Sequence, residues 1–355
     1  MSGPKMLLDP ARLGTQAGNL EKDMRKRIVG QDEAVRQIVE RYQIFLAGMA
    51  APGRPVGTML FLGPTGAGKT HSVEALAESV MGDPLAVVKI DCAEFQHSHE
   101  IAKLIGSPPG YLGHRETHPL LSQEALNQFH TDTLKLSFVL FDEIEKASDA
   151  LWNLLLGILD KATLTLGDNR RVDFSRAMIF LTSNLGAADM NQILQPKLGF
   201  AAAQPLSLDF STATRLARSG IEAARRRFSP EFVNRIDKIV VFRPLGSAEL
   251  LQVLDLELEA VQHRLENSSE TPEVQFTVND QAREFLLREG LDPRYGARHL
   301  KRAVERSVVN PLSCLIASGQ IQERDRLVVD FDPEQDRLVF FKESREPAAA
   351  AATAA

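Results

Sequence analysis

The segment 63–70 constrains the fold of this chain more than any other stretch of the sequence. It is a glycine, four further residues and then Gly-Lys-Thr, and it comprises Gly63, Pro64, Thr65, Gly66, Ala67, Gly68, Lys69 and Thr70. An apolar run at 59–62 precedes it, and helix-forming residues at 72–79 follow it. Glycines let backbone N–H groups turn inward around a polyphosphate, and the N-terminus of a following helix adds its positive dipole end.

This context predicts a phosphate-binding loop between a buried strand and a helix. Lys69 is expected to reach the β and γ phosphates of a nucleotide, while the hydroxyl of Thr70 ligates a magnesium ion. A glycine-rich turn without a ligand is the alternative, and the flanking strand and helix patterns disfavour it.

The composition is that of an ordinary soluble globular protein, with 355 residues and a formal net charge of −6. The length leaves room for two or three compact units, and the mild acidity argues against a dedicated nucleic-acid binder. Cys92 and Cys314 are interpreted as buried small hydrophobic residues in a reducing compartment, because two thiols cannot form a zinc module. No run approaches the roughly eighteen apolar residues of a membrane span, and the N-terminus lacks a signal-peptide pattern. We therefore expect a cytoplasmic protein with no membrane or nucleic-acid partner.

Five apolar runs, separated by helix-length segments, predict the strands of a sheet. They lie at 59–62, 86–91, 138–141, 178–181 and 239–242. Such runs are typical of a parallel sheet covered by helices on both faces, so we expect an α/β nucleotide-binding domain over 26–242. Residues 1–25 are expected to form a loose lead-in that becomes helical near Leu20, and Asp32 is placed to cap the next helix.

A domain boundary is predicted at Pro244-Leu245-Gly246. A long amphipathic helix over 247–267 follows, and the remaining pattern predicts strands at 274–278, 327–331 and 338–341 and helices over 280–289 and 298–318. These elements predict a small α+β domain over 243–342. The alanine-rich tail 343–355 is expected to be disordered.

Two adjacent carboxylates, Asp142 and Glu143, end the apolar run at 138–141. The carboxyl ends of strands are where parallel sheets place ligands. Asp142 is expected to hold magnesium through its hydration shell. Glu143 is expected to act as general base for the attacking water, a role worth roughly 10²- to 10⁴-fold in rate. A solvated acidic strand end is the alternative, and the phosphate loop upstream disfavours it.

Further motifs follow in a fixed order along the chain. With the phosphate loop and the Asp142-Glu143 strand, they are Thr182-Ser183-Asn184, the segment 232–237 and the segment 295–298. In this order they resemble the AAA+ ATPases, and more narrowly the second ATPase module of Clp-family unfoldases such as ClpB and ClpA. The resemblance extends from about residue 26 to 332 and implies ATP and Mg²⁺ as cofactors. It also implies a five-stranded P-loop domain with a C-terminal lid and a homo-oligomeric ring, a hexamer in this family.

The resemblance assigns roles to single polar side chains. Asn184 matches sensor 1 and would hold the catalytic water or the γ phosphate, whereas a buried turn asparagine is the alternative. Arg235 matches the arginine finger that reaches the ATP of a neighbouring subunit, which can be worth roughly 10³- to 10⁵-fold in rate. Its alternative is an ion pair with Asp237 or another nearby carboxylate. Arg298 matches sensor 2 and would link the lid to the γ phosphate, whereas a solvated first-turn arginine is the alternative.

The residues expected to line the adenine are Ile28, Val29 and Gln31. Apolar packing in a plain core would equally explain that segment.

A loop around Tyr111 and Leu112 resembles the Clp pore loop, in which one tyrosine per subunit grips an unfolded polypeptide in a central channel. A large aromatic flanked by glycines is costly on a polar loop unless it grips something, although a tyrosine packed on its own domain is the alternative. His114 stands where the family usually has an aromatic residue. The segment 165–171 resembles the second pore loop, and its Gly-Asp-Asn is also good turn chemistry.

The tripeptide Leu198-Gly199-Phe200 resembles the plug that some Clp unfoldases offer to a ClpP-type peptidase. A helix-end glycine followed by a packing phenylalanine explains the same residues.

Taken together, the sequence predicts an ATP-driven, ring-forming protein unfoldase that threads polypeptide through a central pore. One alternative is a ring that remodels a partner complex without threading it. Another is a nucleotide-gated scaffold, which would need neither Glu143, Asn184 nor Arg235; a nucleic-acid motor is disfavoured by net charge and by the pore-loop match. The amino-terminal domain and first ATPase module of Clp disaggregases do not fit into the 25 leading residues. We therefore expect either a natural single-module unfoldase or a piece of a longer protein.

Overall fold

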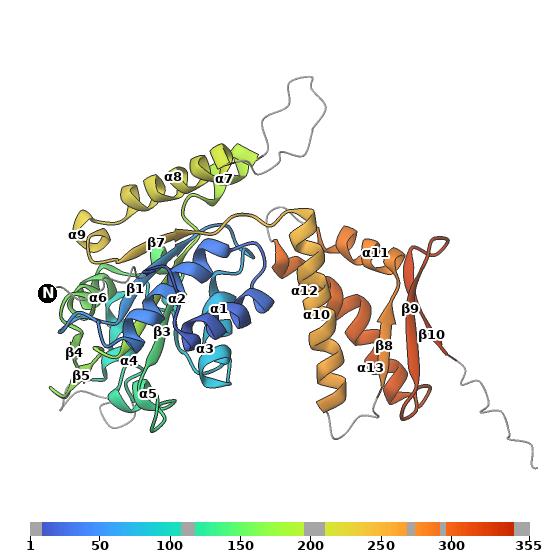
Figure 1. Cartoon of the computed structure of the whole chain (residues 1–355), viewed down its shortest axis with the longest axis horizontal. Coiled ribbons are helices and arrows are strands. Elements are labelled where there is room, and N and C mark those ends of the chain that lie inside the picture. Colours follow the sequence, from blue (N-terminus) through green and yellow to red (C-terminus); the bar gives the residue numbers. More distant parts are fainter. Residues whose placement is uncertain (1–8, 108–117, 195–209, 268–273, 292–295, 344–355) are drawn as a thin grey trace, which may run out of the picture. The chain divides into compact units, whose positions relative to one another are not determined.

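A computed structural model describes residues 9–107, 118–194, 210–267, 274–291 and 296–343 (Figure 1). The chain divides into two compact units, Met1–Pro244 and Leu245–Ala355. Several predicted features lie outside the described residues: Tyr111 and Leu112 of the pore loop, the tripeptide Leu198-Gly199-Phe200, and the tail beyond Glu343.

The first unit is built around a five-stranded sheet with the order β2-β3-β6-β1-β7, in which all pairs are parallel (Figure 1). Its strands are β1 (Gly57–Leu62), β2 (Val88–Asp91), β3 (Ser137–Asp142), β6 (Ala177–Ser183) and β7 (Lys238–Val241). Each predicted apolar run supplies one strand, so the predicted α/β class is confirmed. Because parallel strands end at the same edge, the loop after β1 lies beside the residues that end β3 and β6.

Helices cover both faces of this sheet because side chains alternate along its strands. On β1, Leu60 and Leu62 belong to one apolar cluster together with α6 (Asp149–Lys161). Met59 and Phe61 belong to a second cluster, which includes side chains of α1 (Thr15–Arg27), α2 (Asp32–Leu46) and α3 (Lys69–Met81). All six residues of β1 are buried. A strand buried on both faces is apolar throughout, and this is why the sequence shows it as a continuous run.

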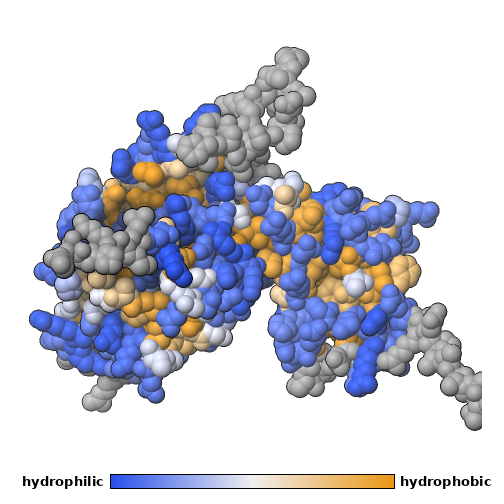
Figure 2. Space-filling view, in the orientation of Figure 1, coloured by the Kyte–Doolittle hydropathy of each residue, from blue (hydrophilic) through white to orange (hydrophobic). Residues whose placement is uncertain are grey.

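The surface visible in Figure 2 is mostly hydrophilic over both units, with hydrophobic areas between the polar side chains. Exposed large apolar residues such as Met49, Leu85 and Phe341 are ordinary for a protein surface. Among the described residues, no helix combines the length and the apolar content needed to cross a bilayer. Cys92 is buried as predicted, and burial raises the pKa of its thiol. The prediction of a buried thiol is wrong for Cys314, which is exposed because it lies on the outer face of α13 (Asn310–Ala317).

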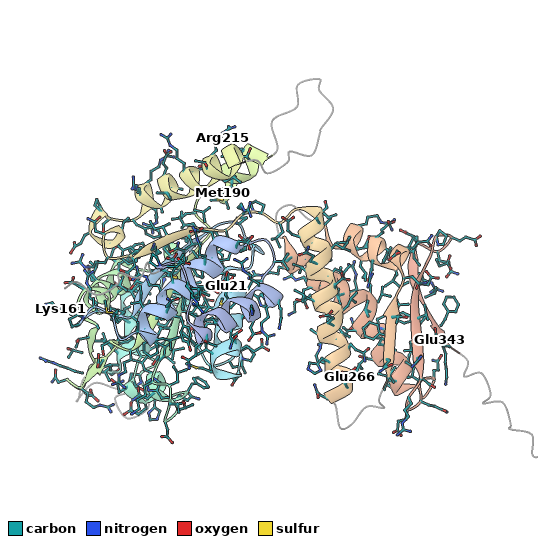
Figure 3. The ribbon with its side chains drawn as sticks, in the orientation of Figure 1. Glu21, Lys161, Met190, Arg215, Glu266 and Glu343 are labelled. Carbon is teal, nitrogen blue, oxygen red and sulfur yellow. The ribbon has the colours of Figure 1, made fainter. Side chains whose placement is uncertain are left out.

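The other elements of the first unit lie around the sheet. They are α4 (Ala102–Ile105), α5 (Gln123–Asn127), β4 (Thr163–Thr165), β5 (Arg171–Asp173), α7 (Ala187–Leu194), α8 (Phe210–Arg227) and α9 (Pro230–Val233), with 3₁₀ turns at Cys92–Glu94, Ser98–Ile101 and Ile144–Lys146. Met190 and Arg215, labelled in Figure 3, mark α7 and α8, which lie side by side. Gly220 of α8 makes this contact possible, because a Cβ there would lie 2.6 Å from the Met190 methyl group.

The N-terminal segment differs from its prediction. Helix α1 begins at Thr15 instead of near Leu20, and Ala17, Leu20 and Met24 are buried in the cluster that covers the sheet. These positions share one helix face, so the segment from Thr15 onward is part of the packed unit. Asp32 is the first residue of α2 and not its cap, and its carboxylate pairs with a guanidinium of α1.

The second unit is a small α+β structure around its own apolar core. Its elements are α10 (Ser247–Asn267), β8 (Gln275–Val278), α11 (Asp280–Gly290), α12 (Ala297–Val304), α13 (Asn310–Ala317), β9 (Arg326–Asp332) and β10 (Arg337–Lys342). In the sheet order β10-β9-β8, β10 is antiparallel to β9 and β8 is parallel to it. Leu254, Leu286, Leu300 and Val329 are completely buried. Glu266 and Glu343 mark the end of α10 and the end of the described sheet in Figure 3.

The helix predicted over 298–318 is interrupted. A π-helical turn at Glu305–Val309 separates α12 from α13. Pro311 gives the physical reason, since it has no N–H and its ring crowds the carbonyl four residues earlier, at Ser307 within this turn. A π turn widens the helix locally and accommodates such a proline.

Candidate nucleotide-binding site

The loop after β1 turns at glycines with positive φ: 151° at Gly63, 77° at Gly66 and 93° at Gly68. A Cβ at Gly63 would lie 2.5 Å from the carbonyl oxygen of Phe242, so the close approach of two backbones excludes any side chain there. Helix α3 begins at Lys69, directly after the loop. The structure therefore has the strand, glycine loop and helix that the sequence predicts, in an arrangement suited to bind an anion.

Lys69 is almost completely buried, with 8% of its surface exposed. Its Nζ donates to the carbonyl oxygens of Gly63 at 2.7 Å and Pro64 at 2.9 Å, and to Oδ1 of Asn184 at 2.9 Å. The ammonium group is thus held inside the loop, beside the residue that follows β6.

Asp142 ends β3 next to the first turn of α3. Thr70 Oγ1 donates to the two carboxylate oxygens of Asp142 at 3.2 and 3.3 Å, and the hydroxyl of Thr182 donates to the same carboxylate. Mg²⁺ prefers oxygen ligands, and a hydroxyl and a carboxylate both supply them. The residues present therefore fit the predicted magnesium site at Thr70 and Asp142.

Glu143 follows with a left-handed backbone, at φ 56°. This conformation is uncommon for a residue other than glycine and is a form of local strain. The N–H of Glu143 donates to Thr182 Oγ1 at 3.0 Å, which holds the turn in place. The carboxylate pairs with Lys146, and its hydrogen bond is the largest cause of the raised pKa of that lysine.

Asn184 contacts both sides of the site. Its Oδ1 accepts from Lys69, its Nδ2 lies 3.3 Å from Oε1 of Glu143, and its backbone N–H donates to Glu145 at 3.0 Å. Thr65 of the loop lies 3.4 Å from the same Oδ1. The structure thus brings the predicted residues Lys69, Glu143 and Asn184 together.

Thr182 is a site residue to which the sequence analysis assigned no role. Its hydroxyl accepts from the Glu143 backbone and donates to Asp142, and the residue is 1% exposed. The signal was available in the sequence, because Thr182 lies near the carboxyl end of the predicted strand, only two residues before Asn184, and parallel strands place ligands at that edge.

Arg235 follows α9 and is partly buried. Its guanidinium lies 3.0 Å from Oε1 of Glu231 and 3.7 Å from Oδ1 of Asp160, both in its own chain. Asp237, the partner named in the sequence analysis, instead accepts from the Thr58 backbone at 2.8 Å. The contact with a subunit neighbour remains a prediction.

The three residues predicted to line the adenine differ in their surroundings. Ile28 is buried in the cluster that covers the sheet, which agrees with plain core packing, and Val29 is half-buried. Gln31 is buried, and its amide binds the backbone of Ala67 and Arg243.

Arg298 lies in the first turn of α12 in the second unit, and its side chain is exposed. Its predicted link to the γ phosphate remains a prediction.

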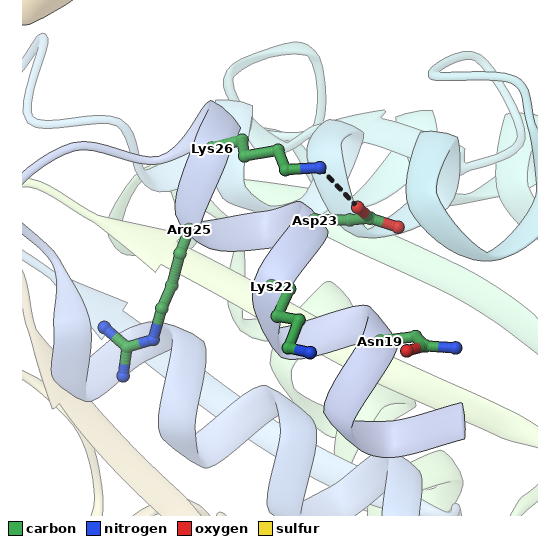
Figure 4. A pocket seen from close by; sticks show the side chains of 5 residues that line it. All are labelled: Asn19, Lys22, Asp23, Arg25 and Lys26. Atoms are coloured by element: carbon green, nitrogen blue, oxygen red, sulfur yellow. Dashed lines mark hydrogen bonds and ion pairs between the residues drawn. The ribbon is translucent and has the colours of Figure 1, made fainter. Parts of the chain in front are cut away.

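A shallow hollow lies beside α1 (Figure 4), lined by Asn19, Lys22, Asp23, Arg25 and Lys26. In Figure 4, Lys26 points toward Asp23, with 3.4 Å between Nζ and Oδ1, and Arg25 points away to the other side. Arg25 pairs with Glu21 at 2.8 Å. Because all the lining residues belong to one helix and none to the phosphate loop, we do not assign this hollow to the nucleotide.

Known protein families match both units. Residues 54–239, more than half of the chain, match the AAA domain (Cdc48 subfamily). Residues 245–329 match the C-terminal, D2-small domain of ClpB protein.

Curated relatives are ATP-binding subunits and chaperones of the Clp type. The ATP-dependent Clp protease ATP-binding subunit ClpC of Staphylococcus epidermidis is 37% identical over 317 residues, covering 89% of this chain and 37% of the relative. The chaperone protein ClpB of Bdellovibrio bacteriovorus is 38% identical over 312 residues, covering 88% of this chain and 33% of the relative. The chain thus spans about a third of the length of these relatives.

A solved structure supports the same relationship. The closed-state cryo-EM reconstruction of Hsp104 with ATPγS and FITC-casein aligns with a TM-score of 0.74 at 27% identity, covering 92% of this chain and 52% of that one. With the family match of the first unit and the ClpB-type match of the second, the chain belongs to the AAA+ ATPase family and is similar to the second ATPase module of the Clp unfoldases.

Proposed function

We propose that this chain hydrolyses ATP and uses the energy to unfold or remodel polypeptides as a subunit of a homo-oligomeric ring. The observation that carries the proposal is the meeting of five predicted side chains at one edge of the sheet. They are Lys69, Thr70, Asp142, Glu143 and Asn184, connected by the hydrogen bonds described above.

Each of these side chains has a separate task in hydrolysis. Lys69 binds the β and γ phosphates, and Thr70 with Asp142 would hold Mg²⁺, which would neutralise charge on the phosphate oxygens. Glu143 accepts the proton of the attacking water, which Asn184 orients. The amide of Asn184 already contacts both the cation of the loop and the carboxylate of the base.

The proposed assembly is a hexameric ring in which Arg235 reaches the ATP of the neighbouring subunit and Arg298 contacts the γ phosphate from the lid. The family match and the similarity to ClpB, ClpC and Hsp104 support this proposal. In the single chain, Glu231 and Asp160 hold the Arg235 guanidinium, and these carboxylates would release it when a triphosphate approaches.

We further propose that Tyr111 and Leu112 grip the substrate polypeptide and thread it through the pore. Remodelling of a partner complex without threading is the alternative within the same family. A scaffold that binds nucleotide without hydrolysis is a second alternative, disfavoured because binding alone needs no base at Glu143.

Two substitutions test the proposal. Glu143→Gln should keep ATP binding and lower the turnover of ATP by at least about 10²-fold, since it removes the general base. Tyr111→Ala should keep ATP turnover within about twofold and stop the unfolding of a tagged fluorescent protein. A matched Phe341→Ala variant should retain both activities, because that exposed aromatic lies in the second unit. Normal turnover in Glu143→Gln would contradict the hydrolytic site. Persisting unfolding in Tyr111→Ala would favour remodelling without threading.

A ClpP-type peptidase is proposed as a partner through Leu198-Gly199-Phe200. Deletion of this tripeptide should abolish co-sedimentation with such a peptidase and leave ATP turnover unchanged. If co-sedimentation is unchanged, or is never observed with the intact chain, the partnership is excluded.

A further inference from the structure

Gln31 occupies an unusual place for a polar side chain, since it is 5% exposed and its amide meets two separate stretches of backbone. Nε2 donates to the carbonyl oxygen of Ala67 at 3.2 Å and to that of Arg243 at 2.9 Å. In return, the backbone N–H of Arg243 donates to Oε1 of Gln31 at 3.1 Å. The side-chain amide thus pairs with the main chain of Arg243 as a neighbouring strand would, and also binds the phosphate loop.

A second contact strengthens the same connection. Nη2 of Arg243 donates to the carbonyl oxygen of Gly30 at 3.2 Å. The side chain of Gln31 therefore binds the backbone of Arg243, and the side chain of Arg243 binds the backbone of Gly30. On the other side of the loop, the Gly63 backbone lies against the Phe242 carbonyl, where a Cβ would be only 2.5 Å away. The phosphate loop therefore contacts this stretch of chain at two points. Gly63 contacts Phe242 directly, and Ala67 is connected to Arg243 by the hydrogen bonds of Gln31.

The position of Arg243 gives this connection its significance. Arg243 and Pro244 are the last residues of the first unit, and the second unit begins at Leu245. A shift of the loop backbone would therefore be passed to the residue from which the chain enters the second unit. Both donors of the Gln31 amide are engaged with backbone carbonyls, which leaves its N–H groups unsuited to reading a base.

We propose that Gln31 is a positioning residue that fixes the phosphate loop to the Arg243 connection, and that it acts on the phosphates of any nucleotide instead of selecting adenine. The inference rests on the proposed nucleotide function, but its first test needs no nucleotide. A buried amide that satisfies three backbone groups is costly to remove, because those groups are left without partners.

The variant Gln31→Met keeps the length of the side chain and removes its hydrogen bonds. Gln37→Met is the matched control, because Gln37 lies in α2, the helix that begins directly after Gln31, is 7% exposed and binds Glu33 instead of the loop. Hydrogen exchange of the Arg243 amide is the first measurement. Pro244 has no amide proton, so the Arg243 amide can be followed in a short peptide that contains both.

The second measurement compares the binding of ATP and of inorganic tripolyphosphate, each with Mg²⁺, by calorimetry. In Gln31→Met we expect exchange of the Arg243 amide to rise about tenfold and both affinities to fall by a common factor of about ten. Gln37→Met should match the wild type in both measurements. If Gln31→Met does not fold, Arg243→Met removes the Gly30 contact at a half-buried position, and the backbone amide of residue 243 should still exchange faster by about threefold.

Exchange that equals the wild type in the folded variant would overturn the proposal. A loss of ATP affinity with unchanged tripolyphosphate affinity would also overturn it and would assign Gln31 to the base. If the wild type and Gln37→Met bind neither ligand, the proposed nucleotide function fails, whereas the exchange of the Arg243 amide still decides whether the connection exists.

Discussion

The ammonium nitrogen of Lys69 lies 2.9 Å from the side-chain oxygen of Asn184. The other end of the same amide lies 3.3 Å from the carboxylate of Glu143. The polarity of the amide suits this position, because its oxygen faces the cation and its N–H faces the carboxylate. One short side chain therefore connects the residue proposed to bind the phosphates with the residue proposed to activate the water.

Replacement of this side chain should separate catalysis from binding. Asn184→Ala should lower kcat for ATP by about 10²- to 10³-fold, the usual cost of removing one donor aimed at a reacting group. The affinity for ATP should change by less than about tenfold, since Lys69 and the loop backbone still bind the phosphates. Steady-state turnover and nucleotide titration measure the two effects.

Asn19→Ala is a suitable control, because Asn19 is an exposed residue of α1. It should leave both parameters unchanged. An Asn184→Ala enzyme with wild-type kcat would reduce Asn184 to the buried turn asparagine that the sequence also allowed.

The hydroxyl of Thr182 offers a second prediction. Thr182→Val has nearly the same shape but loses the acceptor for the Glu143 N–H and the donor to Asp142. Because both partners lose their hydrogen bond to this hydroxyl, we expect the free energy of unfolding to fall by about 1–3 kcal/mol. Glu143 should also leave its left-handed conformation more often, so kcat should fall, by about tenfold or more, with little change in ATP affinity.

Thr182→Ser retains the hydroxyl and is the matched variant. It should restore most of the turnover while still losing one buried methyl group, at a cost of about 1 kcal/mol. Thermal unfolding and turnover of the two variants separate the hydrogen bonds from the packing. Equal turnover in Val and Ser variants would show that the hydroxyl does not position Glu143.

Much of the site was readable from the sequence because each part is locally encoded. The strands are buried on both faces and so are apolar throughout, and parallel strands then bring residues 63–70, 142–143 and 184 to one edge without further information. The parts that were missed depend on contacts between distant segments. Gln31 and Arg243 are 212 positions apart, and no local pattern indicates that the side chain just before α2 binds the backbone two residues after β7.

Helix boundaries failed for a similar reason. The sequence placed the start of α1 near Leu20, because the buried face of α1 consists of the small Ala17 together with only two large residues. The π turn at Glu305–Val309 was missed because Pro311 signals an interruption but not how neighbouring packing accommodates it.

A third prediction concerns the proposed action of Arg235 across subunits. Arg235→Ala should lower ATP turnover by about 10³-fold in a uniform assembly, in the range of a finger supplied in trans. When variant and wild-type subunits are mixed, turnover should fall non-linearly with the variant fraction, because each variant subunit also disables a neighbour. Mixing at several ratios and measuring turnover tests this dependence.

Arg218→Ala provides the control for a lost surface arginine, since its side chain is 81% exposed. Its mixtures should retain wild-type turnover at every ratio. A linear dependence for Arg235→Ala would assign the residue to an ion pair with Glu231 and Asp160 within its own subunit.

The last prediction uses the close approach of Gly63 to Phe242. Gly63→Ala would place a methyl group 2.5 Å from a carbonyl oxygen at a φ of 151°, where non-glycine residues are strained. We expect a loss of at least about 2 kcal/mol in stability, together with weaker ADP binding, since the loop must shift to admit the methyl group. Gly18→Ala is the matched control, because Gly18 lies inside α1 and, apart from its neighbours and the backbone of its own helix, nothing lies within 4 Å of the added Cβ. It should stabilise the protein by up to about 1 kcal/mol. Thermal unfolding with and without ADP measures both variants, and a Gly63→Ala protein that melts and binds as the wild type would show that the loop and the end of β7 can separate freely.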